Sequence, residues 1–533
     1  MKRYFTYILV VSLALLVSCN KEDQARVEEL NATLTELEGK VDEMGLPSAV
    51  KPGVETDDEY FISFDRQKYG VDAGGSVTVK YSVQEPSTVS ITVNGDLTAK
   101  VNATSETSGE IVISAPDPAS PAEIVINAET NSGMKSARKV PVMIRDPYTD
   151  ATRTYVNALG YYNFKPQWAT LDNFKKLAEA GLKSVTVETG DFDYKIQMDL
   201  AHQAGLKTLP IIGWVASNYE RDPANYKGLD QMIDYLMHHP ATMAYHICDE
   251  PSTREIPSLR VRKEKIESLD PDHPVYINLN PDGSIDALGV DNYHDYIEAF
   301  ARDCKCKFIS FDMYPILPGG AVMTHWHRCL RDVSEVTRKY GIPFWAFAAS
   351  CWIDREAPTQ FRGRPSTENL RLQVYTDLAY GAQVVQYFTI QQYGGTSLSP
   401  ILADGTWTEA YDYLKEATLQ VQKRGYVFDG CNVHKVGFAG ISSVWGDLLA
   451  PSDLPAEIES LNTSDMALVS LLGNRGNEYV AIVNQSYTDK IKASVTLNEA
   501  VYTIERDGSF VERPSGYNEF TIDEGDLLLF KIK

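Results

Sequence analysis

The sequence predicts three folded domains, and the central one is a (β/α)8 or TIM barrel, in which eight parallel strands are surrounded by helices. Three observations carry this prediction. In residues 151–431, short apolar runs alternate with segments whose apolar residues recur at three-and-four spacing, the pattern of repeated βα units. The residues before and after this stretch instead show the two-residue alternation of antiparallel strands. At 533 residues the chain also exceeds what one hydrophobic core can organise.

Eight apolar runs of the central stretch are the predicted strands: 155–162, 184–189, 208–214, 243–250, 275–280, 308–314, 343–352 and 383–391. The clearest predicted helices between them are 171–180, 194–204, 229–238 and 367–380, and most end near a glycine, as helix C-termini do. Roughly 280 residues for eight units agrees with the typical barrel size of about 250 residues. An open doubly wound sheet is the alternative. It expects a glycine-rich phosphate turn after the first strand, and Gly160-Tyr-Tyr-Asn163 is not one.

Polar and aromatic residues gather at the carboxyl ends of these predicted strands. The run 243–250 is the most informative, because it ends in two carboxylates, Asp249 and Glu250, and Pro251 cannot continue a central strand. A parallel barrel keeps its chemistry at this edge. Other strand ends carry Glu188, Trp214, Asp312, Tyr314, Trp352, Gln391 and Gln392. Aromatic rings suit the C–H faces of sugars, and glycosidic cleavage needs a carboxylic acid with a second carboxylate.

Several of these motifs together resemble a (β/α)8 glycoside hydrolase. They are Asp249-Glu250-Pro251, Phe311-Asp312-Met313-Tyr314-Pro315, and the segments 371–375, 379–382 and 386–388. The chain is similar over its middle half to β-galactosidase-like proteins encoded by gut Bacteroidetes. The resemblance implies an acid/base glutamate after the fourth strand, which Glu250 matches, and a nucleophilic glutamate after the seventh. The chain departs from the second position, since 344–352 contains no carboxylate.

Three interpretations of this departure stay open. The second carboxylate comes from elsewhere, with Asp312 the first choice and Glu188 the next, or hydrolysis is inverting, or catalysis has been lost. Carboxyl groups about 5–5.5 Å apart indicate retention and about 6.5–9.5 Å inversion. We therefore expect a glycoside hydrolase with Glu250 as general acid and Asp312 as partner carboxylate. The alternative is a non-catalytic glycan-binding lipoprotein on a degenerate barrel. The residues expected to contact substrate are Trp214, Tyr245, His246, Asp249, Tyr314, Trp352, Tyr387 and Gln391.

The flanking domains are predicted to be β-sandwiches. Residues 53–147 alternate apolar and polar side chains with Asn94-Gly95 and Ser108-Gly109 turns between them, which favours an Ig-like sandwich without a disulfide. Residues 432–533 contain strand-like runs at 466–472, 479–484, 493–497 and 527–532. A C-terminal β-sandwich beside the barrel is common in the glycosidases that the chain resembles.

The N-terminal segment predicts export and anchoring. Residues 1–18 carry Lys2 and Arg3 before an apolar core that is shorter than the ~20 residues of a membrane span, as in a signal peptide. Ser18-Cys19 resembles a lipoprotein box, which implies a lipidated Cys19 and a cell-envelope protein at the outer membrane, on its surface or periplasmic face. An ordinary secretory signal is the alternative. Within the anchor region 19–52, residues 27–44 form a heptad pattern under three heptads long, so a monomeric stalk and a weak homo-oligomer both stay open.

Composition and the weaker motifs argue against other classes of function. A net charge of -23 argues against nucleic-acid binding, which needs a basic face. No phosphate loop, flavin fingerprint or Gly-x-Ser-x-Gly motif occurs, so no cofactor is expected. His325-Trp-His327 has too few ligands for a metal site and is more typical of a helix surface. The expected partner is therefore a carbohydrate.

Overall fold

The computed structural model describes residues 61–64, 69–71, 74–116, 123–140, 142–144, 157–161, 164–190, 194–282, 285–353, 363–393, 396–441, 445–474 and 477–532. The predicted signal peptide, Cys19 and the heptad segment 27–44 lie outside these residues. Of the helices that are described, none has the length and apolar character needed to cross a membrane.

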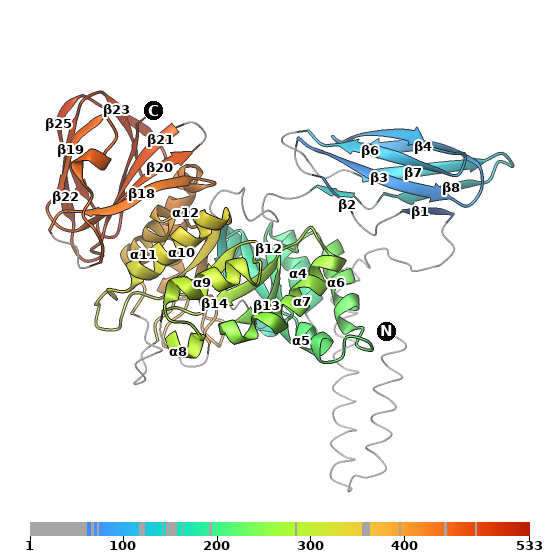
Figure 1. Cartoon of the computed structure of the whole chain (residues 1–533), viewed down its shortest axis with the longest axis horizontal. Helices are drawn as coiled ribbons and strands as arrows, with labels where there is room; N and C mark the ends of the chain where they lie inside the picture. Colours follow the sequence, from blue (N-terminus) through green and yellow to red (C-terminus); the bar gives the residue numbers. More distant parts are fainter. Residues whose placement is uncertain are drawn as a thin grey trace, which may run out of the picture. The chain divides into compact units, whose positions relative to one another are not determined.

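A closed barrel of eight parallel strands forms the central domain, which confirms the predicted barrel (Figure 1). Each predicted strand run overlaps one observed strand, and the observed strands are shorter because the ends of most runs lie in the connecting segments. The strands are β10 (Asn157–Gly160), β11 (Ser184–Glu188), β12 (Lys207–Ile211), β13 (Tyr245–Asp249), β14 (Val275–Leu279), β15 (Ile309–Phe311), β16 (Phe344–Ala349) and β17 (Val384–Phe388).

Helices follow the strands, and several begin or end at residues that the sequence marks. Side-chain oxygens of Thr170, Asn292 and Ser366 accept backbone N–H groups at the starts of α3, α9 and α11, and α10 ends at Gly341 with a φ of 65°. The helices are α3 (Leu171–Glu179), α4 (Tyr194–Gln203), α5 (Gly213–Arg221), α6 (Gly228–His238), α7 (Ile256–Leu269), α8 (Ile285–Leu288), α9 (Tyr293–Arg302), α10 (Trp326–Tyr340), α11 (Thr367–Ala379) and α12 (Glu409–Phe428).

Two apolar layers hold the barrel together, because successive residues of a strand face opposite sides of the sheet. The inner layer includes Tyr276, Phe308 and Trp345, and the rings of Phe308 and Trp345 stack with centroids 4.1 Å apart. The outer layer packs strand residues such as Tyr245 and Ile277 against the helices. This alternation decides which strand residues can reach the carboxyl edge of the barrel interior.

The N-terminal part contains two antiparallel sheets around one apolar core, as in a β-sandwich. The first sheet has the order β1 (Ile62–Phe64), β3 (Ser76–Val83), β6 (Ser108–Ser114) and β5 (Thr98–Ala103). The second has the order β4 (Ser87–Asn94), β7 (Glu123–Thr130) and β8 (Lys135–Lys139), and a parallel pair joins β2 (Tyr69–Val71) to β9 (Val142–Ile144). The Ig-like topology stays a prediction.

The C-terminal part also consists of two antiparallel sheets, with a core of its own. The larger sheet has the order β18 (Asn432–Ala439), β20 (Ala467–Asn474), β21 (Asn477–Asn484), β26 (Leu527–Lys531), β23 (Val501–Ile504) and β24 (Phe510–Arg513). The smaller has the order β19 (Ile458–Thr463), β22 (Ile491–Leu497) and β25 (Gly516–Ile522). Predicted strands of this domain are therefore observed as strands.

Buried contacts join this C-terminal domain to the barrel helices α10 and α12. Arg424 of α12 is 1% exposed and pairs with Asp526 at 2.9 Å, while the Asn474 side chain donates to the carbonyl of Val427 at 2.9 Å. His327 lies at the same junction, stacked on Trp445 with ring centroids 5.0 Å apart. The prediction of a helix-surface position is wrong for His327, which is 1% exposed, and burial lowers its pKa to about 3.

Candidate active site

A β-bulge in β13 points Asp249 toward the barrel interior. His246 pairs with Tyr276 of β14, and their rings stack with centroids 4.8 Å apart inside the barrel. The register then shifts between His246 and Cys248, so that Asp249 pairs with Asn278. Without the extra residue, strict alternation would place Cys248 opposite Asn278 and turn Asp249 toward the helices. The bulge therefore brings this carboxylate to the site.

Asn278 joins two carboxylates at the carboxyl edge. Its side-chain Nδ2 donates to Oδ1 of Asp249 at 3.0 Å and lies 3.3 Å from Oδ1 of Asp312. Asp312 directly follows β15 and is 7% exposed, whereas Asp249 is open to solvent at the rim. Because one nitrogen contacts both oxygens at these distances, the oxygens lie closer together than roughly 6.5 Å, the lower limit for inverting glycosidases.

The carboxyl group of Asp249 is suited to holding a proton. Burial by the surrounding protein raises its pKa to about 6, the charge of Glu250 adds to the rise, and the hydrogen bond from Asn278 opposes it. The side chain is reached by solvent at the rim, but protein packed around the carboxyl group limits its hydration. Below pH 6 the protonated form therefore predominates.

Glu250 has an unusual backbone conformation. Its φ is +48°, in the left-handed region that costs a non-glycine residue about 1 kcal/mol or more. Two hydrogen bonds hold it there: its N–H donates to the carbonyl of Asn278 at 2.8 Å, and its carbonyl accepts from Nδ2 of Asn280 at 2.6 Å. The Glu250 side chain is exposed next to Asp249. Strain held in this way is typical of functional positions.

His246 and Tyr161 extend the site across the barrel. The Tyr161 hydroxyl lies 3.0 Å from Nε2 of His246. Burial lowers the pKa of His246 to about 3, so the ring is neutral and supplies no positive charge to the nearby carboxylates. Both side chains are almost fully buried. They form the polar floor of the site on the side of β10 and β13.

Aromatic side chains form a cluster beside this polar floor. Tyr161, Tyr314, Phe347 and Phe388 pack together, with the Tyr161 and Phe347 rings 5.2 Å apart and the Tyr314 and Phe388 rings 5.4 Å apart. Tyr161 and Tyr314 lie just after β10 and β15, and Phe347 and Phe388 belong to β16 and β17, strands that come together in the closed barrel. Tyr314 was predicted from the sequence. Tyr161 was missed, although it lies next to the end of the first predicted strand, 155–162.

Three other predicted contact residues and Glu188 also lie at the carboxyl ends of strands. Trp214 is the second residue of α5, is 51% exposed, and donates from Nε1 to Oγ1 of Thr189 at 3.3 Å. Trp352 is half-buried, with the Arg364 guanidinium 5.7 Å from its ring centre. Gln391 is buried and accepts a hydrogen bond from the backbone of Lys165. Glu188 is exposed at the end of β11.

Tyr245 and Tyr387 do not reach the site, and their prediction as substrate contacts is corrected. Tyr245 is fully buried and its hydroxyl donates to the carboxylate of Asp270, at the end of α7. Tyr387 accepts a hydrogen bond from Oγ1 of Thr418 of α12 at 2.9 Å. Strand alternation explains both, because each tyrosine belongs to the face of the sheet that packs on helices.

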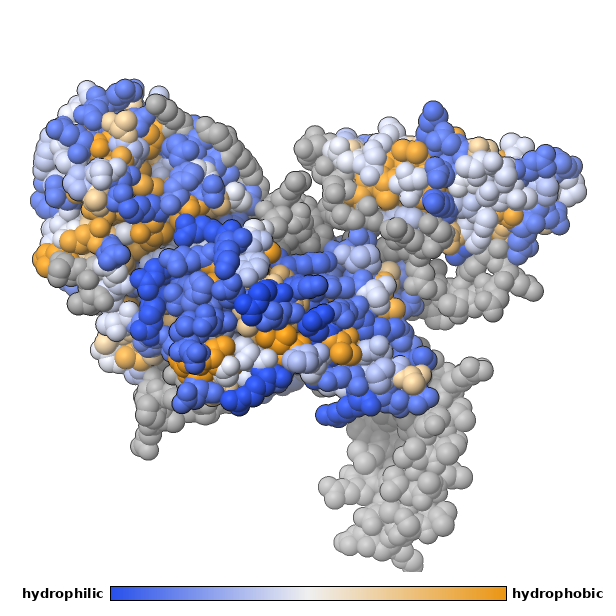
Figure 2. All heavy atoms as spheres, viewed as in Figure 1, coloured by the Kyte–Doolittle hydropathy of each residue, from blue (hydrophilic) through white to orange (hydrophobic). Residues whose placement is uncertain are grey.

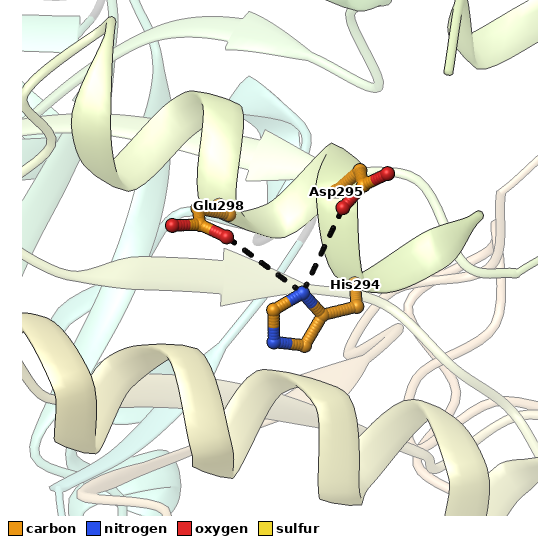
Figure 3. Close-up of side chains that lie close together, drawn as sticks. All are labelled: His294, Asp295 and Glu298. Atoms are coloured by element: carbon orange, nitrogen blue, oxygen red, sulfur yellow. Dashed lines mark ion pairs between the residues drawn. The ribbon is translucent and has the colours of Figure 1, made fainter. Parts of the chain in front are cut away.

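Within the described residues, one group of side chains has the spacing of metal ligands, and it lies outside the barrel. His294, Asp295 and Glu298 of α9 place ligand atoms within 4.8 Å of one another (Figure 3). Glu298 is already paired with Lys339 and accepts from the Tyr340 hydroxyl at 2.8 Å. Figure 2 shows mainly hydrophilic residues on this face of the barrel. The group is best described as a surface ion-pair cluster.

Comparison with known proteins gives similarity at the level of solved structures. No protein-family model and no curated protein matches the chain. A cold-adapted β-galactosidase from Rahnella sp. R3 is 10% identical, with a TM-score of 0.43, covering 71% of this chain and 99% of that one. A β-L-arabinopyranosidase from Geobacillus stearothermophilus is 12% identical, with a TM-score of 0.41, covering 72% and 97%. A β-galactosidase from Marinomonas ef1 is 11% identical, with a TM-score of 0.38, covering 50% of this chain but 60% of its own length.

Proposed function

We propose that the chain is a glycoside hydrolase in which Asp249 and Asp312 act as the two carboxylates. The observation that carries the proposal is the single amide of Asn278 in contact with both carboxyl groups at the carboxyl edge of the barrel. Paired carboxylates of unlike environment are what glycosidic cleavage needs. In the neighbouring aromatic cluster, Phe388 is partly exposed and offers a ring face on which a sugar can stack, while the other three rings are buried behind it.

The spacing of the pair supports a retaining mechanism. In the first step an Asp312 oxygen forms a bond to the anomeric carbon while the bond to the leaving oxygen breaks, and Asp249 gives its proton to that oxygen. In the second step Asp249, now ionised, takes a proton from water, and the water oxygen displaces Asp312 from the anomeric carbon. The carboxyl group that holds its proton to higher pH is suited to the acid role, and the pKa of about 6 supports Asp249 in this role.

The sequence-based assignment of the acid role to Glu250 stays a prediction, and Glu250→Gln distinguishes it from Asp249. If Asp249 is the acid, Gln removes a neighbouring negative charge and lowers the pKa of Asp249. The basic limb of the pH–rate profile should then move to lower pH, with the maximal rate kept within about tenfold. A loss of about 10²–10⁴ at every pH, with the basic limb unmoved, would return the acid role to Glu250.

The function itself is tested with a panel of 4-nitrophenyl α- and β-glycosides and reducing-end-labelled oligosaccharides at pH 5 to 6. We expect hydrolysis of at least one sugar by the wild type and none by the double variant Asp249→Asn/Asp312→Asn. Binding of a sugar by calorimetry without turnover in any assay would favour the glycan-binding alternative. Absence of both hydrolysis and binding would contradict both functions.

We also propose that Cys19 is lipidated and anchors the protein at the outer membrane, on the support of the short apolar segment and the small residue before Cys19. Cys19→Ala should release active protein into the soluble fraction or block maturation. Intact-mass analysis of the wild type checks this, with Ser18→Gly as a control that keeps a small residue before Cys19. A mature chain without acyl mass would contradict the anchor and leave plain secretion.

A further inference from the structure

A chain of hydrogen bonds continues from Asn278 into the middle of the barrel. Oδ1 of Asn278 lies 2.9 Å from Oγ of Ser310, and Nε2 of Gln386 donates to the same Oγ at 2.8 Å. The Tyr276 hydroxyl donates to Oε1 of Gln386 at 2.8 Å and lies 2.9 Å from Oγ of Ser310. Tyr276, Ser310 and Gln386 are 0% exposed, and Asn278 is 3% exposed. The network therefore lies in the dry interior of the barrel.

The hydrogen bonds of the network can run in one direction when Ser310 gives its single proton to Asn278, which leaves the 2.9 Å contact between the Ser310 and Tyr276 hydroxyls without a proton. Tyr276 donates to Gln386, Gln386 donates to Ser310, Ser310 donates to Oδ1 of Asn278, and Nδ2 of Asn278 is left facing Asp249 and Asp312. A flipped Asn278 amide would put Oδ1 against two carboxyl oxygens and Nδ2 against a hydroxyl. Aligned hydrogen bonds also strengthen one another in a dry interior. The carboxyl oxygens and the buried network therefore favour the same orientation of the amide.

We propose that Gln386 is a positioning residue: acting through Ser310 and Asn278, it keeps Nδ2 of Asn278 directed at the carboxylates and so maintains the hydrogen bond that Asp249 accepts. This role of Gln386 adds to the proposed function. It rests on that function for the pH–rate profile, whereas the titration of Asp249 does not depend on it. Gln386 does not touch the carboxylates. Its influence passes through two intermediate side chains.

The other groups that face Asp249 do not supply this control. Glu250, the next residue, raises the pKa of Asp249, and Asp312 lies across the site in contact with the same amide of Asn278. Tyr276 of β14 is kept neutral because burial raises its pKa well above the usual value, and His246 of β13 is kept neutral because burial lowers its pKa to about 3. Burial and the charge of Glu250 raise the pKa of Asp249, and the hydrogen bond from Asn278 lowers it. Loss of this hydrogen bond should therefore raise the pKa of Asp249.

The test is Gln386→Met, which keeps the side-chain length and removes both hydrogen-bonding groups. The matched control is Gln383→Met, because Gln383 is a buried glutamine directly before the same strand, hydrogen-bonded to backbone groups at the other end of the barrel. Protein labelled with ¹³C at the aspartate carboxyl carbons is titrated by NMR, and the resonance missing in Asp249→Asn identifies Asp249. Ser310→Ala provides a second break in the chain if Gln386→Met does not fold.

In Gln386→Met and in Ser310→Ala the pKa of Asp249 should rise by up to about one pH unit, the effect of losing its hydrogen bond from Asn278 altogether. In Gln383→Met it should stay at the wild-type value. The basic limb of the pH–rate profile should move to higher pH by the same amount, with KM little changed.

A titration of Gln386→Met and Ser310→Ala that matches Gln383→Met would overturn the inference. The NMR titration needs no substrate, so a protein without glycosidase activity refutes the proposed function while the shift in the pKa of Asp249 still tests the role of Gln386.

Discussion

Asp312→Asn is expected to lower kcat/KM for any glycoside the protein cleaves by a factor of about 10³ or more, without loss of the fold. Asp312 is the carboxylate proposed to bond the anomeric carbon, and an amide is too weak a nucleophile to replace it. The change keeps the shape of the side chain and an oxygen that can contact Asn278, and it removes the negative charge of the carboxylate. The measurement is the initial rate on the best substrate of the panel, together with the thermal unfolding midpoint.

The matched control for this loss is Asp332→Asn. Asp332 is a partly buried aspartate on α10, outside the site, and burial raises its pKa. Its replacement should leave the rate unchanged. Asp312→Ala adds a second readout, because the space it leaves can admit azide and yield a glycosyl azide. Near-normal activity in Asp312→Asn, combined with a large loss in Glu188→Gln, would move the partner role to Glu188.

Asp249→Asn should lower the rate by about 10²–10⁴ for natural oligosaccharides and much less for aryl glycosides with good leaving groups. The reason is that an activated leaving group departs without a proton, whereas a sugar alkoxide does not. The dependence of the rate on the leaving group measures this directly. Equal losses on both kinds of substrate would indicate that Asp249 positions the sugar and does not act as the acid.

The same variant carries an independent signature in its stability. The pKa of Asp249 is raised in the folded state to about 6, above its ordinary value of 3.8, so the folded state binds this proton more tightly than the unfolded chain. Wild-type protein should therefore lose stability relative to Asp249→Asn as the pH rises from about 4 to about 6, and the difference should stay constant above that range. Chemical unfolding at several pH values checks this. A difference that does not vary with pH would place the pKa of Asp249 at its ordinary value.

The barrel itself could be predicted because each strand is a short apolar run bounded by helical periodicity. Eight such runs in order leave few other ways to bury their residues, and the C-terminal sheets follow from two-residue alternation in the same way. Glu188, Asp249 and Asp312 could also be placed at the carboxyl edge, since polar residues that end an apolar run must leave the sheet.

The pairing within the site could not be predicted from the sequence. Asp249 reaches the interior only because of the bulge after His246, and nothing in the residues 243–250 shows that two of them oppose one on the next strand. Asn278 and Gln386 occur inside apolar runs, where a polar residue is as easily explained by local packing. The prediction that Tyr245 and Tyr387 contact substrate was wrong for a related reason. An aromatic residue near a strand end faces either the helices or the barrel interior, and the strand register that decides between them is fixed only in the closed barrel.

The stereochemistry of hydrolysis tests the central claim most directly. If Asp249 and Asp312, held to one amide of Asn278, are the reacting pair, the spacing below roughly 6.5 Å leaves no room for a water between carboxylate and sugar. ¹H NMR of the products in the first minutes of reaction should then show the sugar released with the anomeric configuration of the substrate. Release of the opposite anomer would contradict the account and require a more distant carboxylate, such as Glu188, as the base.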